Sequence, residues 1–372
     1  MSLSRRRLLG LAALASAGSA GGCRGVILDD AADIEGLADR ELAADLAAQA
    51  TAVARRRGIV VPTPGPRARD FGIDTDIALT PADAFYVMKY GTVPAVDADA
   101  FRLRIDGAVA RPVDLTLDDL RALPAVTLMR TLECISNPAG GTLIGNAVWG
   151  GVPFADVLRL AAPDPGAAEL KLTSADGYHT GVPVSLATDP RAYLALTMNG
   201  APLTAEHGFP ARCLFPGRYG QKQPKWLTGI TVQRARHAGH WESQGWSETA
   251  EIRINARMDA PRDHATVRAP VTLRGVAFSD LSGVAAVELV IGNRTVGPAA
   301  LRRAPEPYRD LTWTEWEWVW RDPPPGNHVV LVRAADGAGR RQHRAREHVL
   351  GGTFPDGTSE MHRVRLFVPA AT

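Results

Sequence analysis

Apolar and polar residues alternate with a period of two along much of the chain after residue 100, and this alternation predicts β-strands. The first such run covers residues 101–105, and we expect a turn to follow it at Asp106-Gly107. The pattern at 115–120 instead predicts the start of a short helix, with Thr116 as its N-cap. Beyond about residue 250 the strand-like runs follow one another without a helical pattern between them, at 271–278, 284–291, 313–320 and 328–334. Such a succession predicts a small β-sandwich.

The third of these runs is rich in tryptophan, with Trp313, Trp316, Trp318 and Trp320. Residues two apart on a strand point to the same face of a sheet, so the three even-numbered rings share one face. They could form a platform on which a ligand stacks, or a ladder of side chains packed in the core. The ladder needs no ligand and is the simpler interpretation.

The first residues predict a targeting segment rather than part of the fold. Ser4-Arg5-Arg6-Arg7-Leu8-Leu9-Gly10 precedes an apolar, alanine-rich run that ends at Gly22-Cys23, and this order resembles a twin-arginine export signal. The apolar run at 8–20 is shorter than the roughly 20 residues that a helix needs to span a bilayer. We therefore expect export to the periplasm or cell envelope. The weakly lipoprotein-like residues before Cys23 leave a lipid anchor there open.

Two further segments separate this signal from the strands. Residues 30–57 repeat apolar and charged positions at helical spacing, which predicts an amphipathic lead-in helix. The Pro-rich segment at 61–66 predicts an extended linker, because proline fixes its own φ and restricts the residue before it. A length of 372 residues, with 36 Gly and 27 Pro, suits two strand-and-loop domains behind the export segment.

Cys134 stands at the end of an apolar strand, where Thr131-Leu132-Glu133-Cys134-Ile135-Ser136-Asn137 leads into a loop rich in Gly and Asn. A cysteine at this place can offer its sulfur to a cavity, and its thiolate is the metal-binding form. A lone buried cysteine is also common as an inert apolar residue, so this segment alone leaves both interpretations open. No dinucleotide-binding loop, P-loop, paired-histidine zinc motif or nucleophile elbow occurs in the sequence.

A second cluster lies downstream and is basic. Within about twenty residues, interleaved with Gly and Pro, it contains His207, Arg212, Arg218, Lys222 and Lys225. Such a segment can place donors around a phosphate or pyrophosphate. Taken alone, a solvated basic loop is the simpler interpretation of this segment.

Together the two segments closely resemble the sulfite oxidase family of molybdopterin enzymes. The matching residues are Cys134, Asn137, Ile144-Gly145-Asn146-Ala147, Trp149, Gly151-Val152-Pro153, Met198-Asn199-Gly200, His207-Gly208-Phe209-Pro210 and Lys225-Trp226-Leu227. The resemblance implies an α+β, β-rich fold, with a sulfite-oxidase-type molybdopterin-binding domain followed by an immunoglobulin-like β-sandwich. The expected parts are the export signal (1–23), the lead-in (24–75), the molybdopterin-binding domain (76–248) and the sandwich (249–372).

The resemblance also implies roles for single residues. Cys134 would be the one protein ligand of molybdenum, in keeping with the softness of a thiolate donor. The residues assigned to cofactor binding are Asn137, His207, Arg212, Lys222 and Lys225. The cations among them would hold the pterin phosphate by charge-assisted hydrogen bonds. For His207 the alternative is a structural role before Phe209-Pro210, and Cys213 is expected to be plain core.

Two positions depart from the sulfite-oxidising members of the family. Those members carry an arginine that contacts the oxyanion where this chain has Met88, and a tyrosine close to the metal where it has Leu196. Losing a guanidinium contact to an oxyanion costs about 1.5–3 kcal/mol. The candidates to replace the lost groups are Lys89, Arg218 and Tyr219. The catalytic candidates are thus Cys134, Arg218 and Tyr219.

The expected function is two-electron oxygen-atom transfer by a molybdenum-cofactor enzyme, on sulfite or a related small oxo-compound. The alternatives are a reductase of sulfoxide-like substrates and a non-catalytic cofactor-binding or adhesive protein. Because the sequence contains no haem motif, we expect an external electron carrier such as a cytochrome. The resemblance implies a homodimer formed through the C-terminal domain, for which a structural cap is the alternative. With 42 basic and 40 acidic residues, no global charge recruits nucleic acid.

Overall fold

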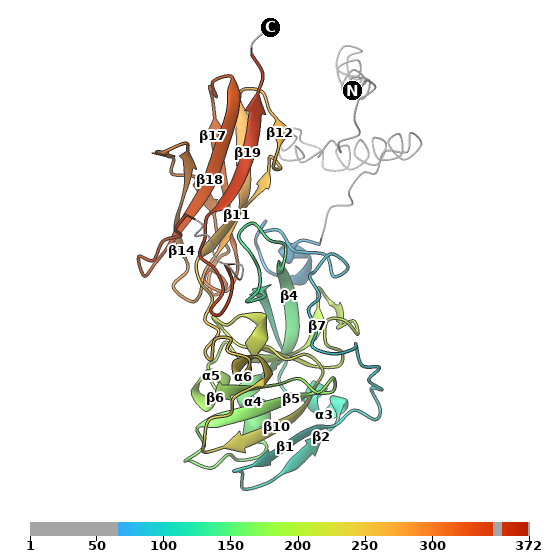
Figure 1. Cartoon of the computed structure of the whole chain (residues 1–372). Helices are drawn as coiled ribbons and strands as arrows, with labels where there is room; N and C mark the ends of the chain where they lie inside the picture. Colours follow the sequence, from blue (N-terminus) through green and yellow to red (C-terminus); the bar gives the residue numbers. More distant parts are fainter. Residues whose placement is uncertain (1–65, 345–351, 371–372) are drawn as a thin grey trace, which may run out of the picture. The chain divides into compact units, whose positions relative to one another are not determined.

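The computed structural model describes residues 66–344 and 352–370 of the chain (Figure 1). The predicted export signal, Cys23, the helix expected at 30–57 and all but the last residue of the linker at 61–66 lie outside these described residues. Within the described part, no helix is long and apolar enough to cross a membrane.

The first sheet contains the alternating run seen first in the sequence. Its strands, in spatial order, are β2 (Val113–Leu115), β1 (Leu103–Gly107), β10 (Leu227–Gln233), β5 (Glu169–Ser174) and β6 (His179–Pro183). Strand β1 pairs in parallel with β10 and the other pairs are antiparallel. The predicted turn at Asp106-Gly107 starts later than expected, because both residues still pair with β10. Gly107 has φ +86°, and a Cβ there would lie 2.2 Å from the carbonyl oxygen of Val232.

Short helices cover the apolar face of this sheet, and they are α3 (Leu117–Arg121), α4 (Phe154–Arg159) and α5 (Val184–Ala187). The predicted N-cap at Thr116 is confirmed, since its hydroxyl accepts from the Asp119 backbone N–H at 3.1 Å. The Asp119 carboxylate accepts from the Thr116 N–H at 2.8 Å in return, which completes a capping box.

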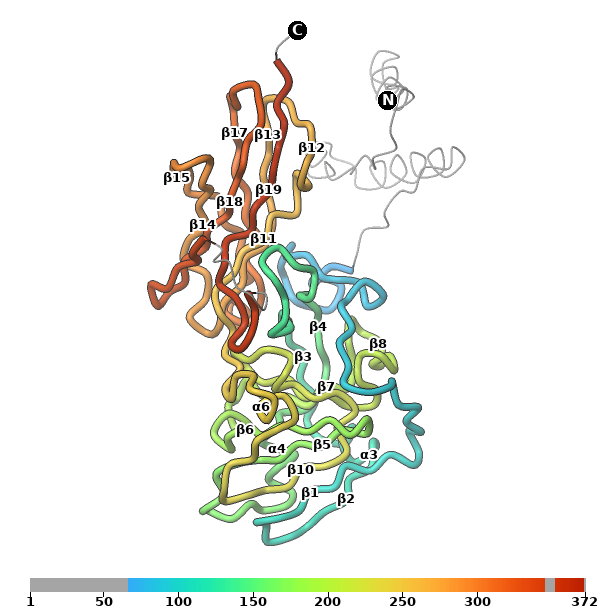
Figure 2. The backbone as a smooth tube through the Cα atoms, viewed as in Figure 1, coloured from blue at the N-terminus to red at the C-terminus, as the bar shows by residue number. Residues whose placement is uncertain are grey.

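The second sheet holds the segment that ends in Cys134. Its strands are β3 (Val126–Glu133), β4 (Ile144–Pro153), β7 (Tyr193–Met198) and β8 (Ala201–Pro202), and β9 (Arg212–Leu214) also pairs with β7. Strands β3, β4 and β7 lie side by side (Figure 2). Most residues of β3 and β4 are buried on both faces, so the pleat alternation is absent from their sequence. Two 3-10 turns and one short helix complete this half, namely η2 (Ala68–Phe71), η3 (Gly220–Lys222) and α6 (His240–Ser243).

The remaining strands form two sheets that pack over one core, and the predicted β-sandwich is confirmed. One sheet has the order β11 (Asn255–Ala260), β13 (Val271–Phe278), β17 (Thr314–Trp320), β16 (Ala300–Arg302). The other has the order β12 (Ala265–Thr266), β19 (His362–Val368), β18 (Gly326–Asp336), β14 (Val284–Ile291), β15 (Arg294–Val296). Trp316, Trp318 and Trp320 all pack against the sandwich core, so the packing ladder is also confirmed. The likeness to immunoglobulin domains stays a prediction.

Candidate active site

Cys134 is the first residue after β3, and the loop that follows it is tightly hydrogen-bonded. The Cys134 N–H donates to the Leu143 carbonyl at 2.9 Å, and the Cys134 carbonyl accepts from the Asn137 N–H at 3.0 Å. The Asn137 side chain accepts from the Leu143 N–H at 2.9 Å. The Cys134 sulfur lies 3.1 Å from the Ser136 hydroxyl oxygen. Hydrogen bonds at both ends of the loop thus fix the backbone that carries the Cys134 sulfur.

The β-sandwich braces this loop from the other side. Asn255 at the start of β11 donates to both carboxylate oxygens of buried Glu133, at 3.1 and 2.8 Å, and Asn137 donates to one of them at 2.8 Å. Arg257 donates to the Gly141 carbonyl at 3.0 Å. Removing the Asn255 amide would leave one oxygen of a buried carboxylate without its hydrogen bond, which is costly. The C-terminal domain therefore supports the segment that carries Cys134.

Gly140, in the same loop, packs against the half-buried ring of His362 on β19. A Cβ at Gly140 would lie 2.1 Å from that ring, and the ring Nδ1 accepts from the Met258 N–H at 3.0 Å. Burial lowers the pKa of His362, so its neutral form is favoured in the folded protein. Its contribution to stability is complete above the unfolded pKa of about 6.5 and is lost as pH falls below it.

We therefore expect the urea concentration at the midpoint of unfolding to fall as pH is lowered from 7 to 5. It should fall less in the His362→Gln variant than in the wild type. One proton contributes at most about 1.4 kcal/mol per pH unit. Urea unfolding of both proteins, followed by fluorescence at several pH values, measures the difference. An identical pH dependence in the variant would contradict a stabilising role for neutral His362.

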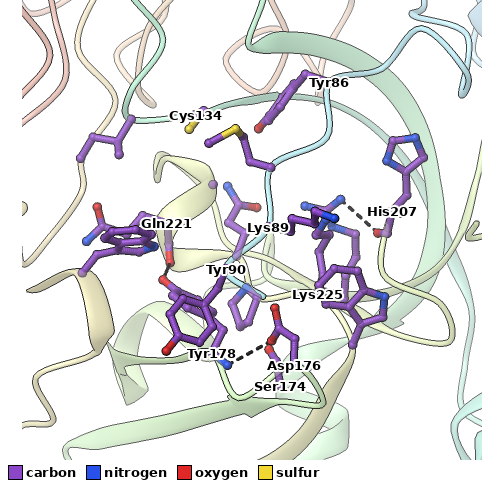
Figure 3. A pocket seen from close by; sticks show the side chains of 18 of the residues that line it. Tyr86, Lys89, Tyr90, Cys134, Ser174, Asp176, Tyr178, His207, Gln221 and Lys225 are labelled. Atoms are coloured by element: carbon purple, nitrogen blue, oxygen red, sulfur yellow. Dashed lines mark hydrogen bonds between the residues drawn. The ribbon is translucent and has the colours of Figure 1, made fainter. Parts of the chain in front are cut away.

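The Cys134 sulfur opens onto a cavity with about 960 Å³ of empty space, its open mouth included. Figure 3 shows Cys134 and Tyr86 at one end of it and Ser174, Asp176 and Tyr178 at the other. Burial raises the pKa of the Cys134 thiol, so the protein alone favours the neutral form. A bound metal ion would reverse this preference, because a coordinating thiol loses its proton.

The charged groups that line the cavity are predominantly cationic. Arg212, Lys225 and Lys89 line it, against the single carboxylate of Asp176 among the lining residues that the structure describes. Arg212 is buried, and burial lowers its pKa to about 10. Burial, together with the charge of Arg212, lowers the pKa of Lys225 to about 7. Burial thus disfavours the charged forms of Arg212 and Lys225. A bound anion would stabilise these charged forms, which indicates an anion-binding site.

Several polar atoms of the lining residues lack a partner although they are buried. They are Arg212 Nε, Ser174 Oγ and Gln221 Oε1. Arg212 donates from Nη1 to the His207 carbonyl at 3.2 Å and lies 5.2 Å from the centre of the Trp149 ring, but it makes no ion pair with any carboxylate in the described residues. Buried polar atoms without partners are rare in native proteins. These three atoms therefore indicate that a ligand completes the cavity.

Comparison with known proteins bears on what that ligand is. Residues 90–241 match the family described as "Oxidoreductase molybdopterin binding domain". The chain is 34% identical over 164 residues to the "Uncharacterized oxidoreductase YuiH" of Bacillus subtilis, covering 44% of this chain and 81% of that protein. This chain belongs to the molybdopterin-binding oxidoreductases of the sulfite oxidase family. The predicted family and its cofactor are thereby confirmed.

Other members of the family carry more specific names. The chain is 36% identical over 155 residues to the "Putative protein-methionine-sulfoxide reductase subunit YedZ1" of Azospira oryzae, covering 42% of this chain and 57% of that protein. It is 27% identical over 295 residues to "Sulfite oxidase" of Arabidopsis thaliana, covering 65% of this chain and 75% of that enzyme. The sulfane dehydrogenase SoxCD of Paracoccus pantotrophus shares the fold, with a TM-score of 0.66 at 20% identity over 78% of this chain and 84% of the other. The predicted β-rich fold class is confirmed.

The residues present fit the molybdopterin cofactor of this family. Cys134 would hold the metal, and Arg212 and Lys225 would hold the phosphate of the pterin by charge-assisted hydrogen bonds. His207 also lines the cavity, but its Nε2 donates to the Ala82 carbonyl at 2.7 Å and its ring packs edge-on against Phe85. The Nε2 atom of His207 therefore has a structural hydrogen bond, as the alternative predicts. The residue also lines the cavity in which the cofactor would bind.

Four predicted site residues do not line the cavity. The Asn137 side chain instead makes hydrogen bonds to Glu133 and to the Leu143 N–H of the Cys134 loop. Lys222 is buried and forms an ion pair with Glu242, with a further hydrogen bond to the Gly181 carbonyl at 2.9 Å. Arg218 lies 3.1 Å from Glu251 in an ion pair, and the buried Tyr219 hydroxyl accepts from the Arg253 N–H at 3.1 Å. These side chains have protein partners and do not line this cavity, so the ligand contacts expected of Lys222 and the catalytic roles expected of Arg218 and Tyr219 stay predictions.

Met88 and Leu196, the two positions that depart from the sulfite-oxidising members, lie in different parts of the structure. Met88 lines the cavity and is 46% exposed, so its thioether is available to a substrate. Leu196 packs against the core of the first sheet and is not among the residues that line the cavity.

The sequence interpretation did not select several polar or aromatic residues that line the cavity, among them Tyr86, Ser174, Asp176, Tyr178 and Gln221. Three of them surround the Asp176-Gly177 turn between β5 and β6. An Asp-Gly pair between two alternating runs predicts such a hairpin, but no local pattern indicates that its side chains face a cavity.

Proposed function

We propose that this chain is an exported molybdenum-cofactor oxidoreductase that transfers one oxygen atom to or from the sulfur of a small compound. The observation that carries the proposal is the meeting of the Cys134 sulfur with Arg212 and Lys225 in one cavity. Oxidation of sulfite takes an oxygen from water and releases two electrons and two protons. Reduction of a sulfoxide consumes two electrons and two protons and releases water.

When bound, the cofactor supplies a metal centre that can change its oxidation state by two electrons. The chain would hold the metal at Cys134 and neutralise the cofactor's negative charge with Arg212 and Lys225. The electrons pass to or from a separate one-electron protein such as a cytochrome. Export rests on the paired arginines before the apolar N-terminal run, and dimerisation through the sandwich rests on the family resemblance.

Of these two reactions, the reduction of a neutral sulfoxide is favoured by the residues at the mouth of the cavity. Met88, Tyr90 and Trp241 line it and are 46%, 47% and 37% exposed. Tyr90 contacts His240 with ring centres 4.4 Å apart, and His240 in turn contacts Trp241 at 4.8 Å, so the three rings form a continuous aromatic edge. Such an edge suits the organic groups of a sulfoxide better than the charge of sulfite. The name of the Azospira relative points to the same substrate class.

The Met88→Arg variant tests whether the enzyme acts on sulfite or on sulfoxides. A guanidinium at the mouth is expected to raise kcat/KM for sulfite by about 10- to 100-fold, from a contact of about 1.5–3 kcal/mol. The value for methyl sulfoxides should stay unchanged or fall. Sulfite oxidation is measured with ferricyanide or a cytochrome as acceptor, and sulfoxide reduction with a reduced viologen as donor.

Val87→Arg is the matched control, since Val87 is 41% exposed but does not line the cavity. A screened surface charge should change kcat/KM for sulfite by less than about threefold. Equal effects of the two variants would contradict a specific contact at position 88. A cofactor-loaded protein that turns over neither substrate would support the non-catalytic alternative instead.

A further inference from the structure

The end of the cavity beside Cys134 contains one uncommitted hydroxyl group. Ser136 is engaged with the Cys134 sulfur at 3.1 Å, and at the other end of the cavity the Tyr178 hydroxyl donates to the Gln221 carbonyl at 2.5 Å. Lys225 donates to the Glu206 carbonyl at 2.6 Å. The Tyr86 hydroxyl, by contrast, makes no hydrogen bond within the described residues, although its ring lines the same cavity.

Tyr86 and Cys134 approach the same glycine. A Cβ at Gly220 would lie 3.2 Å from the Tyr86 hydroxyl oxygen and 4.0 Å from the Cys134 Cα. The chain leaves this space free, and Figure 3 shows the hydroxyl end of Tyr86 turned toward Cys134. The hydroxyl group is therefore directed at the region where the sulfur would hold the metal.

Neighbouring aromatic rings fix the position of Tyr86. Phe85 is buried and packs edge-on against Trp149, with ring centres 5.8 Å apart, and against His207 at 5.7 Å. Tyr86 stacks on Phe85 with ring centres 5.3 Å apart and planes inclined by 21°. A ring held in this way can present its hydroxyl with little further loss of side-chain entropy.

We propose that the Tyr86 hydroxyl contacts the substrate and donates a hydrogen bond to its sulfur-bound oxygen. The inference rests on the proposed function and names the residue that orients the substrate beside Cys134. Burial raises the pKa of Tyr86, so the hydroxyl remains a donor throughout the working pH range. A donor fixed in advance stabilises charge on an oxygen atom more than mobile water does, because it needs no reorganisation.

The test is Tyr86→Phe in the cofactor-loaded protein, which removes the hydroxyl and keeps the ring. Molybdenum per chain should equal that of the wild type. We expect kcat/KM for sulfite and for methyl sulfoxides to fall by about 10- to 100-fold. The Kd of dimethyl sulfone, a sulfur-oxygen probe that is not turned over, should rise about three- to tenfold in calorimetric titration.

Tyr308→Phe is the matched control, because Tyr308 is partly buried in the core and does not line the cavity. It should keep the wild-type kinetics and Kd. Unchanged kinetics and Kd in Tyr86→Phe would overturn the proposal, and so would a loss of molybdenum, which would assign the hydroxyl to the cofactor. A wild type that contains molybdenum but turns over neither substrate contradicts the proposed function separately, while the Kd comparison still decides the role of Tyr86.

Discussion

Cys134→Ser is expected to lose the thiolate-to-metal absorption band and to lower turnover by more than about 100-fold. Even the outer partners of metal ligands contribute about 10- to 100-fold, and serine replaces a soft donor by a hard, protonated one. The absorption band reports the bond itself, and metal analysis of the purified protein gives the molybdenum content. The band should disappear together with turnover, also in those molecules that keep the cofactor through its other contacts.

Cys213→Ala is the matched control for this experiment. Cys213 is fully buried, and burial raises the pKa of its thiol, so it acts as a small apolar residue of the core. The variant should lose some stability through a small cavity but keep its molybdenum. If Cys134→Ser retained the metal and the absorption band, the assignment of Cys134 as ligand would be wrong.

Arg212→Met should separate cofactor binding from protein stability. The guanidinium is buried with Nε unpartnered, so a bound anion is the partner that it lacks. Truncating one member of a buried charge pair costs about 2–5 kcal/mol, so cofactor affinity should fall by about 30-fold to several thousand-fold. Molybdenum per chain measures this loss.

The cofactor-free protein should respond very differently to the same change. Losing the hydrogen bond to His207 and the contact with Trp149 costs about 1–2 kcal/mol, but methionine no longer buries an unpaired charge. We expect the free energy of unfolding to change by less than about 1 kcal/mol, measured by urea unfolding of protein from a molybdate-starved host. A strongly destabilised protein would show that Arg212 has a structural role.

Arg218→Met provides the comparison within the same basic cluster. Arg218 pairs with Glu251 near the surface and does not line the cavity. Replacing it should leave molybdenum content unchanged, since a partly exposed ion pair contributes little. Equal losses in both variants would mean that general positive charge, rather than the orphaned guanidinium, attracts the cofactor.

The sequence by itself determined the features that depend on local periodicity. The runs at 271–278 and 284–291 coincide with β13 and β14, and Thr116 caps α3 as its side-chain chemistry predicts. The even-numbered tryptophans face the core because side chains alternate along any strand. Cys134 was singled out by the resemblance of its motif to the sulfite oxidase family, which could be seen because the motif keeps strand end, sulfur and loop within a few residues.

Only the tertiary structure decided which of the candidate side chains meet. Lys222 and Lys225 are three residues apart, yet one turns to Glu242 and the other to the cavity, because η3 and the following bend point them differently. Tyr86 reaches Cys134 across a sequence separation that no local pattern can encode, and the packing of Phe85 fixes its place. Local periodicity sets which face a residue occupies within its own element, whereas long-range packing and the burial of charge select the partner on that face.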